Sequence, residues 1–164
     1  MRLKKKIFIF VFSLTILLFI QTQSYSKIVG NKIILGSALS ITGKYSSDTK
    51  SLIDNNKEII KKINEKNGIK VSGRIYLLDI IYYDNKSNET RANQLLKRLI
   101  QNEGINFLIG PQNFEISDEV KNLINENQLV IVSSYDALEV YIDAFKTIDS
   151  VDSKKIREYI GYNK

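Results

Sequence analysis

Short apolar runs alternate with amphipathic stretches along most of this 164-residue chain, and this alternation constrains the fold more than any other feature. Four runs have the length and composition of buried β-strands, at 32–38, 75–83, 106–110 and 129–132. Between the second and third runs, apolar residues recur at helical spacing, at Ala92, Leu95, Leu96, Leu99 and Ile100. Strands separated by helices of this size favour right-handed crossovers and a parallel sheet covered on both faces. The sequence therefore predicts an α/β fold built on a doubly wound parallel sheet.

Helix boundaries are marked by capping and stop residues. A helix over 47–67 is expected to stop at Asn67-Gly68, and Asn88 is a suitable N-cap for the next one. A third helix carries the apolar residues of 116–124. Beyond the fourth strand we expect a short helix near 136–142, a fifth strand at Phe145–Ile148 and a helix ending near Ile160. The predicted strand order is 2-1-3-4-5.

The predicted strand order alone indicates where a binding site should lie. In open α/β sheets, ligands bind at the carboxyl ends of the strands, where the strand order reverses. With order 2-1-3-4-5 the reversal lies between the first and third strands. The candidate site is then formed by the loops 40–45 and 110–114, with the loop 133–137 beside them. Tyr45 and Tyr135 in these loops could stack on a ligand or shield the end of the sheet.

The N-terminal segment predicts export. Four basic residues among the first six precede an uncharged run of 14, Ile7–Ile20, and Ser24 and Ser26 follow at the −3 and −1 positions of a cleavage site. This pattern is typical of a secretory signal peptide over residues 1–26. The run is shorter than the roughly 17–25 residues that span a bilayer, so no stable membrane anchor is expected after cleavage. The predicted location is periplasmic.

Composition removes several classes of function. The chain contains no His and no Cys, which excludes His/Cys metal sites, thiol chemistry and His-dependent nucleophiles. The formal charge of +6 falls to +2 over residues 27–164, because four of the 24 basic residues and none of the 18 acidic residues lie in the leader. The remaining charges alternate in sign, so no nucleic-acid partner is predicted.

No motif points to catalysis. Gly36 and Gly43-Lys44 are spaced two residues too far apart for a phosphate loop, and Tyr45 stands where Ser or Thr would hold Mg²⁺. Asp84 is interpreted as a hydrogen-bond acceptor at the entry of a helix. Asn85 and Asn88 both fit the N-glycosylation sequon, but we interpret them as turn and cap residues. We therefore predict no enzyme activity, no catalytic residue, no metal and no cofactor.

Four stretches carry a family resemblance: SITGKYSSD at 40–48, the segment 63–100, NFLIGPQN at 106–113 and LVIVSS at 129–134. In their order and spacing they resemble the N-terminal part of the branched-chain amino-acid (leucine-type) periplasmic binding proteins, the solute receptors of ABC importers. The resemblance covers roughly residues 32–160. It implies a type I periplasmic-binding-protein fold, in which two α/β lobes close on a small ligand.

The resemblance also implies site residues. In that family the ligand contacts of the first lobe come from the loops after strands one, three and four. Carried over by position, these are Tyr45, Asn113, Phe114, Tyr135 and Ala137, and Ser133 and Ser134 of the same loops complete the set of candidate site residues. Phe114 and Ala137 stand where amino-acid-binding members offer hydroxyl groups, so Ser133, Ser134 or backbone N–H groups would have to hold a ligand carboxylate. The implied ligand is a small polar molecule, an amino acid or a related compound.

The length of the chain predicts that its lobe is incomplete. Family members continue into a second lobe, so residues 27–164 are expected to form an incomplete, truncated N-terminal lobe. The function implied is that of an exported solute-binding component of an ABC importer, with an ABC permease as partner of a full-length protein. A ligand-sensing or interaction module of the same fold, without transport, is the alternative.

Overall fold

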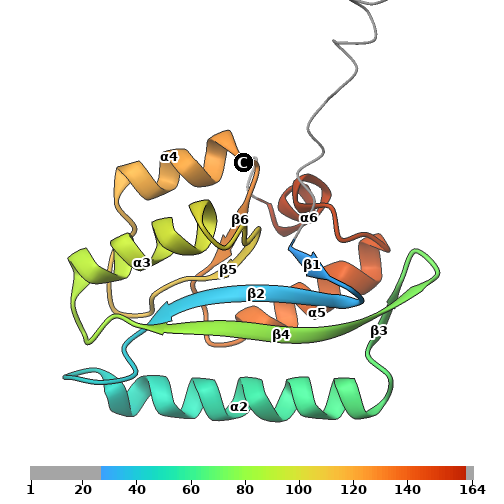
Figure 1. Ribbon diagram of the computed structural model, residues 1–164, viewed down its shortest axis with the longest axis horizontal. Coiled ribbons are helices and arrows are strands. Elements are labelled where there is room, and N and C mark those ends of the chain that lie inside the picture. Colours follow the sequence, from blue (N-terminus) through green and yellow to red (C-terminus); the bar gives the residue numbers. More distant parts are fainter. Residues whose placement is uncertain (1–26, 162–164) are drawn as a thin grey trace, which may run out of the picture.

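The central element is a six-stranded sheet with helices on both faces (Figure 1). The computed structural model describes residues 27–161, and the predicted signal peptide over 1–26 lies outside them. The strands are β1 (Ile28–Val29), β2 (Lys32–Leu39), β3 (Ile69–Val71), β4 (Arg74–Asp84), β5 (Phe107–Ile109) and β6 (Val130–Val132). The helices are α2 (Ser46–Glu65), α3 (Glu89–Gln101), α4 (Asp118–Glu126), α5 (Ala137–Ile148) and α6 (Ser153–Ile160).

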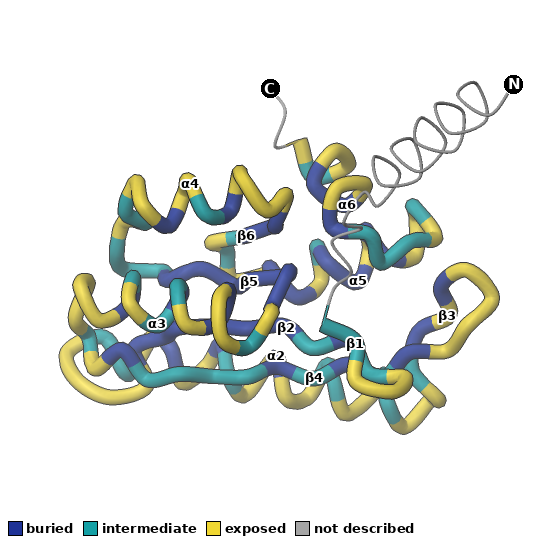
Figure 2. The backbone as a smooth tube through the Cα atoms, turned by 45° about the horizontal axis from the view of Figure 1, so that its top comes forward, coloured by how far each residue is buried: buried dark blue, intermediate teal, exposed yellow. Residues whose placement is uncertain are grey.

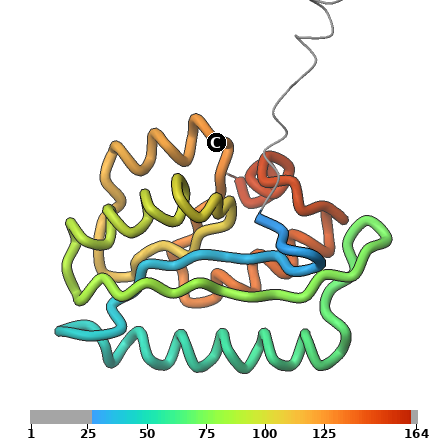
Figure 3. Tube along the Cα trace, in the orientation of Figure 1, coloured from blue at the N-terminus to red at the C-terminus, as the bar shows by residue number. Residues whose placement is uncertain are grey.

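The parallel part of the sheet has the order β4-β2-β5-β6, which is the predicted order 2-1-3-4. The two longest strands, β2 and β4, lie side by side (Figure 3) and pair over Lys32–Leu39 and Leu77–Asp84, and β4 is the outermost strand of this parallel part. Two antiparallel strands extend this frame, β1 on β2 and β3 on β4. The α/β fold and its parallel core are therefore confirmed, while β1 and β3 are additions that the sequence pattern did not indicate.

The predicted fifth strand at Phe145–Ile148 is wrong. Those residues are the last turn of α5, a single helix from Ala137 to Ile148. Tyr141 and Phe145, four residues apart, both pack on Phe107 of β5, with ring centroids 5.5 and 4.9 Å from the Phe107 ring. This i, i+4 contact exists only in a helical conformation, so tertiary packing decides the state of an apolar run that is too short to identify by pattern.

Capping residues act as predicted. Asn88 is the N-cap of α3, where its side-chain oxygen accepts a hydrogen bond of 2.8 Å from the Arg91 N–H. At the other end of α2, Asn67 and Gly68 have φ angles of 67° and 84°, and the Gly68 N–H donates to the Ile63 carbonyl at 2.8 Å. This left-handed turn satisfies a terminal carbonyl of α2 and reverses the chain into β3.

Two apolar layers sandwich the sheet, because successive residues of each strand point to opposite faces. Ile33 and Leu35 of β2 face α2 and α5, and Ala38 belongs to the layer beneath α3 and α4. Figure 2 shows the buried residues concentrated along β2 and β5 between these helices. Within residues 27–161, no helix is long and apolar enough to cross a membrane.

Long-range polar contacts hold the C-terminal helices onto the sheet. Arg157 of α6 is 7% exposed and donates to the Leu129 carbonyl and to the Asn125 side chain, both at 2.6 Å. The turn between β3 and β4 is joined to the end of α5, where the Ser72 hydroxyl donates to the Asp149 carbonyl at 2.6 Å. Segments from the two halves of the sequence therefore depend on each other for their position.

Asn85, directly after β4, is completely buried. Its amide nitrogen donates to the Ala38 carbonyl at 3.1 Å, and its oxygen accepts from the Ser40 hydroxyl at 2.9 Å and the Ser87 N–H at 2.8 Å. These bonds join the ends of β2 and β4. They confirm the interpretation of Asn85 as a turn residue.

Candidate functional site

Three loops leave the carboxyl ends of the parallel strands on one edge of the sheet, and we call them the edge loops: 40–45 after β2, 110–117 after β5 and 133–136 after β6. From β2 the chain crosses to β4 on one side and later to β5 on the other, so the strand order reverses between β2 and β5. The predicted position of the reversal is confirmed. At such a reversal the loops diverge and leave room for a ligand.

The first edge loop is braced by the turn after β4. The Thr42 N–H and hydroxyl donate to the two carboxylate oxygens of Asp84 at 3.1 and 2.7 Å. Ser87 accepts from the Tyr45 N–H at 3.1 Å and donates to the Thr42 carbonyl at 2.9 Å. Gly43 has a φ of 92°, and a Cβ there would lie 2.7 Å from the Ser87 hydroxyl, so this close approach requires glycine. Tyr45 is therefore presented from a fixed loop.

Hydrogen bonds also fix the charge of Asp84. Burial alone would raise the pKa of this carboxyl, but the bonds from Thr42 and from the Lys86 N–H outweigh burial and hold the pKa below its ordinary value. Asp84 is thus an anionic acceptor at the entry to α3, as the sequence suggested.

The structure brings Tyr45 and Phe114 together across the first two edge loops. Their ring centroids are 5.6 Å apart with an interplanar angle of 77°, an edge-to-face contact. The Lys44 ammonium lies 5.0 Å from the centroid of the Tyr45 ring. Both aromatic rings are half-buried, so each packs on the protein and still offers surface to the outside. Lys44, Tyr45 and Phe114 thus place a cation beside two aromatic rings. Such a group can hold a small organic ligand by stacking and by charge.

The second and third edge loops are joined by Gln112. Its amide nitrogen lies 3.3 Å from the Gly110 carbonyl and 3.4 Å from the Ser134 carbonyl. Ser133 packs directly over Gly110, where a Cβ would overlap its hydroxyl group. Asn113 and Ser134 are half-buried, and Tyr135 is 58% exposed. Six of the seven predicted site residues therefore stand on the edge loops with accessible surface.

Ala137 is the exception among the predicted site residues. It begins α5, is completely buried, and belongs to the apolar layer between the sheet and α5. Its N–H donates to the Ser134 carbonyl at 3.2 Å. The Ala137 side chain offers no surface to a ligand, because the start of a helix turns it inward. Its position supports the third edge loop instead.

Two features of this region were missed from the sequence. Ser87 braces the first edge loop from 42 and 45 residues away, and no local pattern reveals such a partner. A hollow of about 450 Å³ lies between Ile41 and the outer side of α2, where Ile53, Lys50 and Lys57 line it. Among residues 27–161 there is no group of three or more acidic side chains that could hold a metal ion.

Comparison with known proteins identifies the family to which this chain belongs. Residues 32–147, from the start of β2 to the last turn of α5, match the model of a family described as periplasmic binding protein. The match covers most of the chain. This protein therefore belongs to the periplasmic binding protein family, a family of binding proteins.

Solved structures resemble this chain at low sequence identity. The branched-chain amino acid transporter substrate binding protein LivJ from Streptococcus pneumoniae, in complex with isoleucine, is 13% identical, with a TM-score of 0.50 over 67% of this chain and 32% of LivJ. A leucine binding protein, LivK from Thermotoga maritima, is 18% identical, with a TM-score of 0.42 over 60% of this chain and 26% of its own. The chain thus spans about a third or less of the length of these proteins. The likeness to LivJ supports the type I periplasmic-binding-protein fold.

One prediction concerns pH. Replacing Asp84 with Asn is expected to cost about 1 kcal/mol of unfolding free energy at pH 7, because the charged acceptor of three hydrogen bonds is lost. The folded pKa of Asp84 is depressed, so its contribution is fully present above the unfolded pKa of about 3.9 and is lost as pH falls through the folded pKa. Urea denaturation from pH 7 to pH 2.5 measures this, and the two proteins should converge at the acid end. Asp54→Asn, on the exposed side of α2, is the control. If the difference in unfolding free energy between the unaltered chain and Asp84→Asn stays constant with pH, the prediction is wrong.

Proposed function

We propose that this chain is the solute-binding component of an ABC importer, exported by the signal peptide 1–26 and acting in the periplasm. The observation that carries the proposal is the family match over residues 32–147, which includes all three edge loops. The isoleucine bound to LivJ supports a small organic ligand of the amino-acid kind. The whole receptor would deliver this ligand to a membrane permease.

The chemistry of the edge loops agrees with a ligand of this size and polarity. Within the described part of the chain, the side chains of Asn113, Ser134 and Tyr135 make no hydrogen bond, so they remain available to a ligand. Tyr45 and Phe114 add an aromatic surface beside them. Hydroxyl, amide and backbone N–H donors can hold a carboxylate, and the rings can cover an apolar side chain.

Ligand binding tests the proposal directly. The secreted chain is titrated with a panel of amino acids by ligand-detected NMR, which registers weak binding. Tyr45→Ala should weaken the binding of the best amino acid about five- to tenfold, since loss of one aromatic contact costs about 1–1.4 kcal/mol. Tyr159→Ala, which removes an exposed tyrosine of α6, should leave binding unchanged. Equal losses in both variants, or no binding by any amino acid, would refute the assigned site.

Export and transport are tested separately. The secreted product should begin at Lys27, and N-terminal sequencing checks this. Deleting the gene should abolish uptake of the ligand that the protein binds. Binding without any effect on uptake would favour a ligand-sensing module of the same fold.

A further inference from the structure

β4 is the longest strand of the sheet, and much of its outer side has no neighbouring strand. Its inner side pairs with β2 over eight residues. In a parallel pair, the peptide groups of alternate residues point toward the partner strand. The Leu77 N–H donates to Asn31 and the Asn85 N–H to Leu39, so the odd-numbered residues face β2. The even-numbered residues from Arg74 to Asp84 therefore point their peptide groups away from the sheet.

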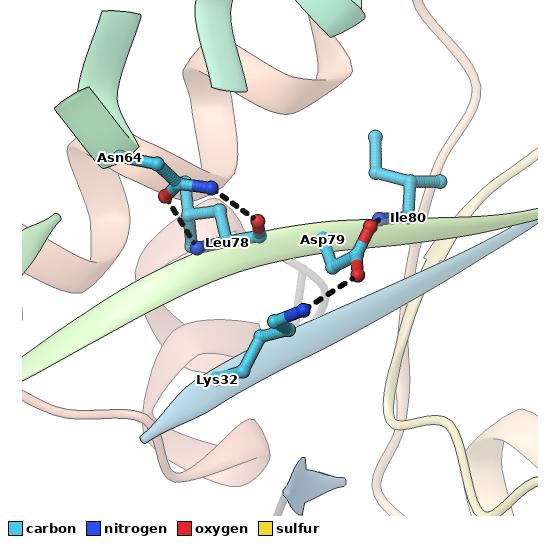
Figure 4. A network of polar contacts seen from close by, with 5 residues as sticks. All are labelled: Lys32, Asn64, Leu78, Asp79 and Ile80. Atoms are coloured by element: carbon cyan, nitrogen blue, oxygen red, sulfur yellow. Dashed lines mark hydrogen bonds and ion pairs between the residues drawn. The ribbon is translucent and has the colours of Figure 1, made fainter. Parts of the chain in front are cut away.

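Most of these outward peptide groups have partners other than a full strand. The short strand β3 pairs with Arg74 and Tyr76. The side-chain amide of Asn64, in the last turn of α2, then takes the place of a strand at Leu78 (Figure 4). Its nitrogen donates to the Leu78 carbonyl and its oxygen accepts from the Leu78 N–H, both at 2.9 Å.

The next outward N–H, that of Ile80, is occupied by the residue before it. Asp79 accepts this hydrogen bond through Oδ1 at 2.9 Å, while its Oδ2 receives the Lys32 ammonium at 3.1 Å. Both contacts are drawn in Figure 4. The ion pair is about half exposed, so its strength is modest, and its geometric effect is to hold the carboxylate against the strand edge.

The part of the β4 edge that lacks hydrogen-bond partners is short, but its residue types are those that pair readily with another strand. Among residues 27–161, no hydrogen-bond partner is found for the N–H and C=O of Tyr82 or for the C=O of Ile80. The surrounding segment, Ile80–Tyr83, is uncharged and consists only of isoleucine and tyrosine. Uncharged segments rich in β-branched and aromatic residues add readily to other strands when they lie on an edge.

We propose that Asn64 and Asp79 keep a second copy of this chain from adding its own β4 to this edge. A second copy fits because two identical β4 edges, related by a two-fold axis, present the same alternating donors and acceptors to each other in antiparallel pairing. Asn64 and Asp79 interrupt that pairing at Leu78 and Ile80. Without them, three successive outward residues, Leu78, Ile80 and Tyr82, would offer a continuous ladder.

The test removes both blocking side chains from the secreted chain. The double variant Asn64→Ala/Asp79→Ala is expected to double its apparent mass with rising concentration in size-exclusion chromatography with light scattering. The unaltered chain should keep the mass of a monomer. The matched control is Asn55→Ala/Asp54→Ala, which removes the same two residue types from the exposed side of α2 and should also stay monomeric.

Two further measurements locate the effect. In the double variant, the Tyr82 amide should exchange its hydrogen more slowly as the dimer forms. Asp79→Asn keeps an oxygen that can accept from Ile80 and should remain monomeric, whereas Asp79→Ala should associate. Asp79 is about half exposed, so Asp79→Ala is expected to fold. It can therefore replace the double variant in the test if the double variant does not fold. A folded Asp79→Ala and double variant that both stay monomeric, or an Asp79→Asn that associates as strongly as Asp79→Ala, would overturn the proposal.

Discussion

Replacing Phe107 with alanine is expected to lower the free energy of unfolding by about 3–5 kcal/mol, the usual cost of removing a buried aromatic side chain. Phe107 is completely buried in β5 and touches Tyr141 and Phe145 of α5 edge-on. The cavity would lie where α5 meets the sheet, so the surrounding rings could close it only by moving a helix. For a domain of ordinary stability, this loss removes a large part of the total.

Urea denaturation followed by circular dichroism measures this loss. Phe107→Leu is the matched control, because it keeps most of the apolar volume and should cost less than about 1.5 kcal/mol. A cost below about 1 kcal/mol for Phe107→Ala would show that α5 is not held through this ring.

Replacing Gly68 with alanine is expected to cost about 3 kcal/mol or more. Its φ of 84° already disfavours any residue with a Cβ by about 1–2 kcal/mol. In addition, the new Cβ would overlap the Tyr76 carbonyl oxygen and lie 2.8 Å from the Tyr76 carbonyl carbon. These are backbone atoms of β4, so the clash can be relieved only by moving the end of α2 or the strand itself.

Gly73 offers the control for this substitution. Its φ of 76° is similar, but a Cβ there would meet nothing within 4 Å. Gly73→Ala should therefore show only the conformational cost of about 1–2 kcal/mol. If thermal melts of Gly68→Ala and Gly73→Ala show the same loss of stability, the close approach of Gly68 to β4 adds nothing to the cost of the substitution.

The parallel core could be predicted because its patterns are long or well bounded. The apolar stripe of α3 and the cap at Asn88 define a helix from sequence alone, and the apolar run at 75–83 defines β4. The run at Phe145–Ile148 was assigned wrongly, since four residues fit a strand and a helix equally well. β1 and β3, of two and three residues, are too short for a periodic pattern to identify them.

The candidate site was located by topology, but its internal contacts were not predictable. That the edge loops lie together follows from the strand order. The contact between Tyr45 and Phe114 and the bridge from Gln112 depend on loop conformation, which the sequence pattern does not determine. The burial of Ala137 depends on the residue at which α5 begins, and such boundaries are uncertain by a few residues in any reading of a sequence.

The buried position of Asn85 has a practical consequence for producing the protein. Its sequon is inaccessible after folding, yet a eukaryotic secretory host modifies such sequences on the emerging chain, before β2 and β4 have paired. A glycan would be attached to the Asn85 amide nitrogen, which donates to the Ala38 carbonyl in the folded protein, and it could not enter the interior. Bacterial secretion avoids this outcome. In a glycosylating host, Ser87→Ala would remove the sequon, but it would also remove the hydroxyl that braces Tyr45.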